Sequence, residues 1–136
     1  MSARLVVDSS VAIKWVKPAG ESDVVAAEAL LDRQQSGEIE LVVPGLMMLE
    51  VANSLWKYAA TESQIKRALK ALRSLHLAVV EPDAKLLDRA AELAVGCNIT
   101  IYDALFAALA DTLGCELVTA DKKLAASGAC KVRALA

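Results

Sequence analysis

The sequence predicts an α/β protein, a three-layer α/β/α sandwich with a mainly parallel central sheet. Two observations support this prediction. Short apolar segments rich in β-branched residues alternate along the chain with longer segments in which apolar residues recur at helical spacing. The chain has 136 residues, 56% of them apolar, which is enough for one buried core. We therefore expect residues 1–136 to form one domain, with any ligand bound where the carboxyl ends of the strands meet.

Each predicted strand is a short apolar run, as expected for strands that are buried on both faces of a parallel sheet. The strands are expected at residues 4–7, 40–44, 77–82 and 116–120, with a possible fifth at 131–135. The first and the fourth of these runs end directly before an acidic residue.

Six segments between the strands have helical periodicity. They cover residues 9–16, 21–38, 45–59, 61–75, 83–96 and 102–114. A Lys-Pro pair closes the first of them, because the residue before a proline disfavours the helical conformation. Thr61 and Gln64 have the spacing of a capping box, and Gly96 and Gly114 are expected to end the last two helices.

The charge balance argues against a protein that binds nucleic acid over its whole surface. The 15 Lys and Arg are balanced by 17 Asp and Glu, for a formal net charge of −2, so any such binding must be local. Cys97, Cys115 and Cys130 are odd in number and widely spaced, which indicates reduced thiols. With no signal peptide and no run of about 18 uncharged apolar residues, we expect a cytoplasmic protein. The high apolar fraction further predicts a homodimer that covers part of the surface.

Asp8 and Asp121 each follow a predicted strand directly. The carboxyl ends of parallel strands meet at one edge of the sheet, so both carboxylates should lie at that edge. Each could instead cap the helix that follows it, which is a frequent role of Asp. The two residues together favour a functional site over two independent caps.

Two further acids lie within apolar helical segments. Glu50 is flanked on both sides by apolar residues, and a charge there needs a polar outlet. Asn53, three residues further on, would share its helical face. Asp103 lies in the first turn of its helix, where the backbone already favours a carboxylate. Glu50 could also belong to the solvated edge of an amphipathic helix, and Asp103 alone indicates little.

Other catalytic arrangements have little support in the sequence. His76 is the only histidine, which excludes a multi-histidine zinc site and makes a Ser-His-Asp triad depend on it alone. Neither a glycine-rich phosphate loop nor an EF-hand loop occurs. Lysines close to the two strand-end acids could contact RNA phosphates at the rim of a carboxylate cleft; these are Lys14, Lys17, Lys122 and Lys123.

Four acidic motifs of the chain resemble those of PIN domains, in the same order and context. They are VVDSSVAIKW with Asp8, LMMLEVANSLW with Glu50, TIYDALFAALA with Asp103 and LVTADKKL with Asp121. The resemblance runs from Arg4 to about Leu135. The small size and the short Asp-Ser-Ser opening resemble the VapC-type ribonuclease toxins of toxin–antitoxin systems.

The resemblance implies a PIN-like fold with strand order 3-2-1-4-5 and a metal-dependent endoribonuclease. The catalytic carboxylates that hold Mg²⁺ or Mn²⁺ would be Asp8, Glu50, Asp103 and Asp121. Ser9, Asn53 and Thr119 would support them as polar neighbours. The resemblance also implies RNA as the substrate, products with 5′-phosphate and 3′-hydroxyl ends, and a protein antitoxin as partner.

Two other functions stay open at this point. The chain could be a catalytically silent PIN-like module that binds nucleic acid or protein. It could also be a phosphotransfer domain in which Asp8 is phosphorylated, although two serines follow Asp8 where a second carboxylate two residues on would be expected. The four acids argue against the silent module, because carboxylates brought together without a cation repel one another and hold a proton or recruit a metal.

Overall fold

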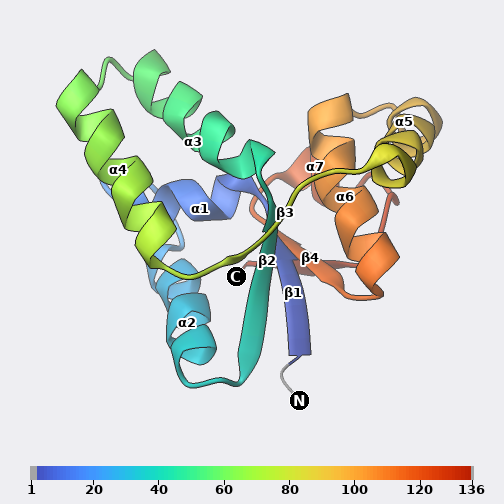
Figure 1. Ribbon diagram of the computed structural model, residues 1–136, viewed down its shortest axis with the longest axis horizontal. Coiled ribbons are helices and arrows are strands. Elements are labelled where there is room, and N and C mark those ends of the chain that lie inside the picture. Colours follow the sequence, from blue (N-terminus) through green and yellow to red (C-terminus); the bar gives the residue numbers. More distant parts are fainter. Residues whose placement is uncertain (1–2, 136) are drawn as a thin grey trace.

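The computed structural model describes residues 3–135 and has a central five-stranded sheet with helices on both faces (Figure 1). The strands are β1 (Ala3–Val7), β2 (Ile39–Pro44), β3 (Ala78–Val80), β4 (Glu116–Thr119) and β5 (Val132–Ala134). They are ordered β3-β2-β1-β4-β5, and every neighbouring pair is parallel. The predicted fold class, the parallel sheet and the implied strand order are therefore confirmed.

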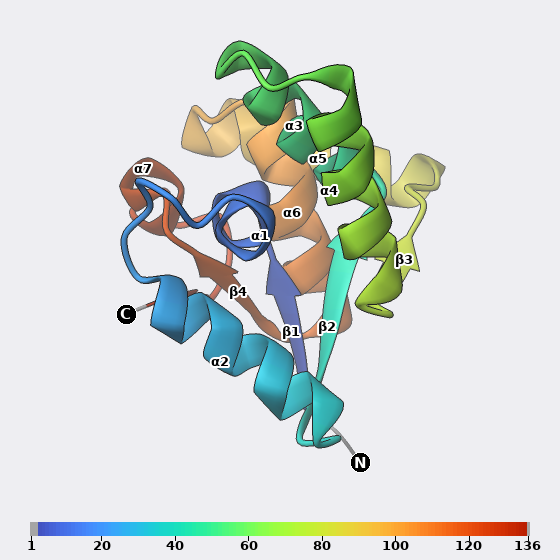
Figure 2. The same cartoon turned by 90° about the vertical axis from the view of Figure 1, so that its left-hand side faces the viewer.

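Seven helices connect the strands in the described part of the chain. They are α1 (Ser9–Val16), α2 (Val24–Gln35), α3 (Leu46–Lys57), α4 (Glu62–Ser74), α5 (Ala84–Cys97), α6 (Ile101–Leu113) and α7 (Lys122–Ala125). α1, α2 and α4 lie on one side of the sheet, and α6 lies on the other side with α5 packed against it (Figure 1 and Figure 2). α3 follows β2 and packs against α1 and α4.

The core is built around the central strands and α6. Residues 5–7 of β1 and 117–119 of β4 are buried, and residues 104–110 of α6 are buried without interruption. A helix that is apolar all round belongs in the interior, and α6 contacts β1, β2 and β4. Asp103, at the start of this helix, is therefore carried by one of the most firmly held elements of the fold.

Most helix ends follow the signals in the sequence. Thr61 Oγ1 accepts a hydrogen bond from Gln64 N at 3.1 Å and Gln64 Oε1 accepts one from Thr61 N at 2.8 Å, which confirms the capping box. Gly114 ends α6 with φ 67°. α5 extends one residue beyond Gly96, because Asn98 adopts the left-handed conformation that ends it, with φ 53°.

The helix α7 is not predicted from the sequence, since a helix of four residues shows no periodicity. Within residues 3–135 no helix is by itself long and apolar enough to cross a membrane, and α5 and α6 pass that test only as a pair bent by 115°.

Candidate carboxylate site

Four elements carry the four predicted acids, two of them at the carboxyl ends of strands. Asp8 follows β1 and is the N-cap of α1, and Asp121 follows β4 and is the N-cap of α7. Because β1 and β4 are neighbours in the sheet, these two residues emerge at the same edge. Glu50 comes from α3 and Asp103 from the first turn of α6. Asp8 and Asp121 are thus helix caps that also share one edge of the sheet.

Asp8 is the most buried of these acids, with 5% of its surface exposed. Its Oδ1 accepts hydrogen bonds from the backbone N–H and the hydroxyl of Ser10, and its Oδ2 accepts one from Thr119 Oγ1 at 2.6 Å. Burial raises the pKa of Asp8, the donors of Ser10 and Thr119 oppose this rise, and the charge of Asp121 adds to it. Three donors therefore orient a carboxylate that is still costly to ionise.

Glu50 is half-buried and faces the start of α1. Ser9 Oγ donates a hydrogen bond to Glu50 Oε1 at 2.8 Å. Burial raises the pKa of Glu50, the hydrogen bond from Ser9 lowers it, and the charges of Asp103 and Asp8 raise it further. The polar outlet that this residue requires within its apolar helix is the Ser9 hydroxyl.

Asp103 and Asp121 lie on the α6 and α7 side of the site. Burial raises the pKa of Asp103 and the charge of Asp121 raises it further, while Thr100 and the charge of Lys123 oppose the rise. Asp121 Oδ1 accepts hydrogen bonds from the backbone N–H groups of Lys123 at 2.9 Å and Leu124 at 3.1 Å. Asp121 therefore both caps α7 and acts electrostatically on its neighbours.

These interactions link all four acids. We call the group the carboxylate site: Asp8, Glu50, Asp103 and Asp121. Within residues 3–135, no three His, Cys, Asp or Glu side chains stand close enough together to enclose a metal ion. The site is thus an open group of mutually repelling acids and differs from a closed metal cage. Such a group suits a cation that keeps part of its water shell.

Two hydroxyls tie the turn after β4 to Asp8. Ser10 Oγ accepts a hydrogen bond from Ala120 N at 2.9 Å, and Thr119 Oγ1 accepts one from Asp121 N at 3.0 Å. Both hydroxyls donate to Asp8. The motif that contains Asp121 already indicates Thr119, whereas the role of Ser10 is not expected, because the only signal for it in the sequence is its place two residues after a capping Asp.

Asn53 lies on the Glu50 face of α3. It lines a cavity of about 260 Å³ together with Ser9 and Glu50. The expectation that Asn53 and Glu50 line one cleft therefore agrees with their positions. The side-chain amide of Asn53 is exposed in this cleft.

The predicted phosphate contact of Lys14 is wrong. Lys14 is only 4% exposed, and its ammonium group donates to Glu21 Oε1 at 2.9 Å and to the Ser22 carbonyl at 2.7 Å. A lysine is tolerated in the interior only with such partners. Lys14 thus anchors the loop between α1 and α2.

The other three lysines remain accessible. Lys17 lies over the ring of Tyr58, with its Nζ 4.5 Å from the ring centroid. Lys122 lines a pocket of about 570 Å³ together with Asp121, and the charge of Lys123 acts on the carboxylate site. Lys122 and Lys123 therefore lie close to acids of the site, whereas Lys17 lies beside Tyr58, and their contacts with RNA phosphates stay a prediction.

The chain is similar to proteins of one family over most of its length. Residues 5–128 match the PIN domain family. The chain is 35% identical over 127 residues to Ribonuclease VapC3 of Pyrobaculum aerophilum, which covers 90% of this chain and 92% of that protein. It is 34% identical over 130 residues to Ribonuclease VapC9 of Mycobacterium tuberculosis, which covers 91% of each.

The fold is also similar to that of one chain in a toxin–antitoxin complex from Klebsiella pneumoniae. A chain of that complex superposes with a TM-score of 0.69 at 20% identity, and the match covers 99% of this chain and 98% of that chain. The family match and the two relatives agree with the resemblance of the four acidic motifs. The chain therefore belongs to the PIN-domain family and, within it, is related to the VapC ribonucleases.

Proposed function

We propose that the carboxylate site binds Mg²⁺ or Mn²⁺ and that the protein uses it to hydrolyse phosphodiester bonds within RNA strands. The strongest support is that four separate elements of the fold bring four acids into one group. Burial and the charge of another acid of the site raise the pKa of Asp8, Glu50 and Asp103, which agrees with this gathering. A fold that gathers acids against their repulsion is stabilised by a divalent cation.

The donor atoms fit such a cation. The site offers carboxylate and hydroxyl oxygens, which are the ligands that Mg²⁺ and Mn²⁺ prefer over softer metals. Asp8, Glu50 and Asp103 would hold the metal, and Asp121 would complete the acidic surroundings. A bound metal lowers the pKa of a water molecule and stabilises the charge that develops on the leaving oxygen.

The protein's own groups keep the acids in place. Ser10 and Thr119 donate to Asp8, and Ser9 donates to Glu50. Hydrogen bonds of this kind hold metal-binding side chains in one orientation while the substrate enters. Asn53, in the cavity beside Glu50, is placed to bind a phosphate or ribose oxygen.

The test is cleavage of RNA by the purified protein with Mg²⁺ or Mn²⁺. A labelled oligoribonucleotide should be cut at internal positions to leave 5′-phosphate and 3′-hydroxyl ends, and EDTA should stop the reaction. A DNA strand of the same sequence should be cut more slowly. Binding of RNA without metal-dependent cleavage would instead identify a silent binding module.

We also propose that this activity is cytoplasmic and is held in check by a protein antitoxin. The three cysteines are free, as is usual in a reducing compartment. The antitoxin would bury an amphipathic segment against the apolar helices and direct an arginine into the carboxylate site, because a guanidinium pairs with carboxylates in a bidentate way. Expression without a partner should arrest growth. Unaffected growth with a nuclease that is active in vitro would contradict the proposal.

Exposed apolar side chains on α3 and α5 support a homodimer. Leu49 and Trp56 lie seven residues apart on one face of α3 and are 70% and 67% exposed, and Val95 on α5 is 86% exposed. The cores of homodimer interfaces are rich in aromatic and apolar residues. We propose that a second copy of the chain covers these side chains.

Val95→Glu is expected to weaken this dimer by about 10- to 100-fold, because a charge replaces an apolar side chain in the interface. Sedimentation of the wild type and the variant over a range of concentrations measures the change. Val25→Glu is the matched control, since Val25 is 82% exposed on α2. A wild type that is monomeric at micromolar concentration would rule out the dimer.

A further inference from the structure

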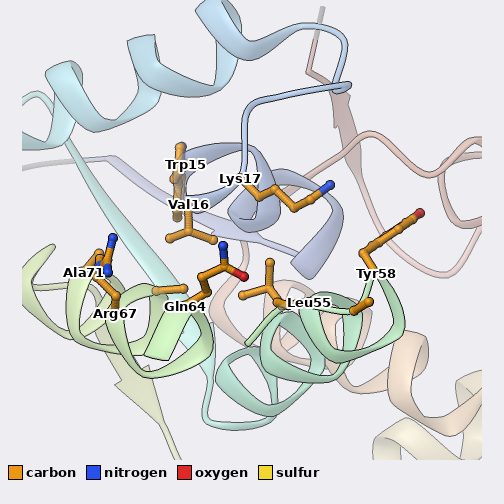
Figure 3. Close-up of a pocket in the computed structure, with 11 residues that line it drawn as sticks. Trp15, Val16, Lys17, Leu55, Tyr58, Gln64, Arg67 and Ala71 are labelled. Carbon is orange, nitrogen blue, oxygen red and sulfur yellow. The ribbon is translucent and has the colours of Figure 1, made fainter. Parts of the chain in front are cut away.

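A pocket lies between α1, α3 and α4, on the side of the sheet that α1 covers (Figure 3). Its volume is about 490 Å³, and its apolar lining includes Trp15, Val16 and Leu55. Lys17 and Tyr58 lie at one end of it and Arg67 at the other (Figure 3). The pocket thus combines an apolar floor with cations at both ends.

A second pocket, also lined by α1 and α3, begins at Glu50 of the carboxylate site. The cavity of about 260 Å³ beside Glu50 is lined by one face of α3, on which Glu50, Asn53, Ser54 and Lys57 follow at helical spacing. Tyr58 lies one turn beyond Ser54, and α1 forms the opposite wall of both cavities. We call the two cavities together the α1–α3 groove.

The charges along the α1–α3 groove are of one sign once the carboxylate site is left behind. Among the residues that line the two cavities, Glu50 is the only acid, whereas Lys57, Lys17 and Arg67 are cations. The whole chain has a formal net charge of −2, so this is a local excess. It favours an anionic occupant whose charges repeat along its length.

An aromatic ring stands among these cations. Tyr58 is 70% exposed although Lys17 lies over its ring at 4.5 Å. An exposed ring between cations in a groove is the arrangement that binds single-stranded nucleic acids, in which a base stacks on the ring and phosphates contact the cations.

We propose that the substrate RNA strand runs from the carboxylate site along the α1–α3 groove, with Lys57 and Lys17 bound to its phosphates and a base stacked on Tyr58. This inference rests on the proposed function, because a strand cleaved at the carboxylate site must continue away from it. A groove that starts at Glu50 and is lined by cations provides that path. An amphipathic segment of a protein is the alternative occupant, which the experiment below distinguishes.

The experiment measures binding of a short fluorescent oligouridylate by anisotropy, in EDTA so that no cleavage occurs. Tyr58→Ala should weaken binding by about 5- to 100-fold, as loss of one stacked base does, and Tyr58→Phe should restore it. The joint variant Lys17→Gln with Lys57→Gln should lower the slope of log affinity against log salt by about 0.7 for each lysine. Tyr58→Ala should leave that slope unchanged.

Lys85→Gln, an exposed lysine on α5 that does not line the α1–α3 groove, is the matched control and should bind like the wild type. Thermal melting establishes that each variant is folded. Cleavage with Mg²⁺ gives an independent readout, since the groove variants should raise KM for long RNA far more than they lower kcat.

The outcomes separate this inference from the proposed function. If the wild type cleaves RNA and the groove variants bind it with unchanged affinity and salt slope, the RNA path is wrong and the nuclease site stands. If the variants lose binding of a synthetic amphipathic helical peptide but keep RNA binding, the groove belongs to a protein and the inference is overturned. Failure of the wild type to cleave any RNA with metal refutes the proposed function itself.

Discussion

Asp103→Asn is expected to lower metal-dependent RNA cleavage by at least about 100-fold while the protein stays folded, because a bound metal supplies several kcal/mol of stabilisation to the transition state. Asp103 suits this test because Thr100, and not Asp103, caps α6. Asparagine keeps the shape and removes the charge, so the helix loses only an interaction with its dipole of about 0.3–1 kcal/mol. The variant should therefore lose most of the initial rate at saturating Mg²⁺ and melt at nearly the wild-type temperature without metal.

The matched control for this variant is Asp32→Asn. Asp32 is exposed on α2, and its replacement should leave both cleavage and melting unchanged. Asp8→Asn should also lose cleavage. Its melting temperature is a less direct control, because the substitution also changes the hydrogen bonds that Asp8 accepts from Ser10 and Thr119. Cleavage by Asp103→Asn at the wild-type rate would show that Asp103 is only a helix-terminal charge and that the proposed catalytic site is wrong.

Glu50→Gln should make the metal-free protein more stable at neutral pH. The pKa of Glu50 is raised in the folded protein, so the native state binds more protons than the unfolded chain between the ordinary and the raised value. Stability of the wild type therefore falls as pH rises through this interval, which begins at about pH 4. Glutamine can accept the Ser9 hydrogen bond without a charge. Denaturation in EDTA should show the variant's advantage at neutral pH and its disappearance below about pH 4.

Addition of Mg²⁺ or Mn²⁺ should reverse this order. A ligand that binds only the native state stabilises it by about 2.7 kcal/mol at 100 times its Kd. The wild type should gain this stability, and Glu50→Gln should gain much less. Glu28→Gln, at an exposed position on α2, should respond to metal like the wild type. An equal response of Glu50→Gln and the wild type would show that Glu50 does not hold the metal.

The fold and the edge that carries the acids could be predicted because both depend on patterns that are local in the sequence. Apolar runs and helical spacing place the strands and helices, and a parallel sheet brings all strand carboxyl ends to one edge. The position of Asp8 and Asp121 at this edge needs no further information, since Asp8 directly follows β1 and Asp121 lies two residues after the end of β4. Strand order, in contrast, came only from the resemblance to PIN domains.

Contacts between distant parts of the chain could not be predicted. Proximity to Asp8 in sequence suggested that Lys14 lies at the rim, but the turn of α1 directs its side chain to Glu21 and Ser22. The role of Ser10 depends on the N–H of Ala120, which is 110 residues away. Such contacts are set by packing of the whole sheet, which periodicity does not describe.

The hydroxyls of Ser10 and Thr119 form a relay with a fixed direction. Each accepts a hydrogen bond from a backbone N–H of the turn after β4 and donates a hydrogen bond to Asp8. A hydroxyl has one proton, so protonation of Asp8 at either bonded oxygen would force one hydroxyl to turn or to lose its partner. The turn that carries Asp121 is therefore joined to Asp8 by hydrogen bonds whose direction fits the ionised carboxylate, in addition to the effect of the charge of Asp121 on Asp8.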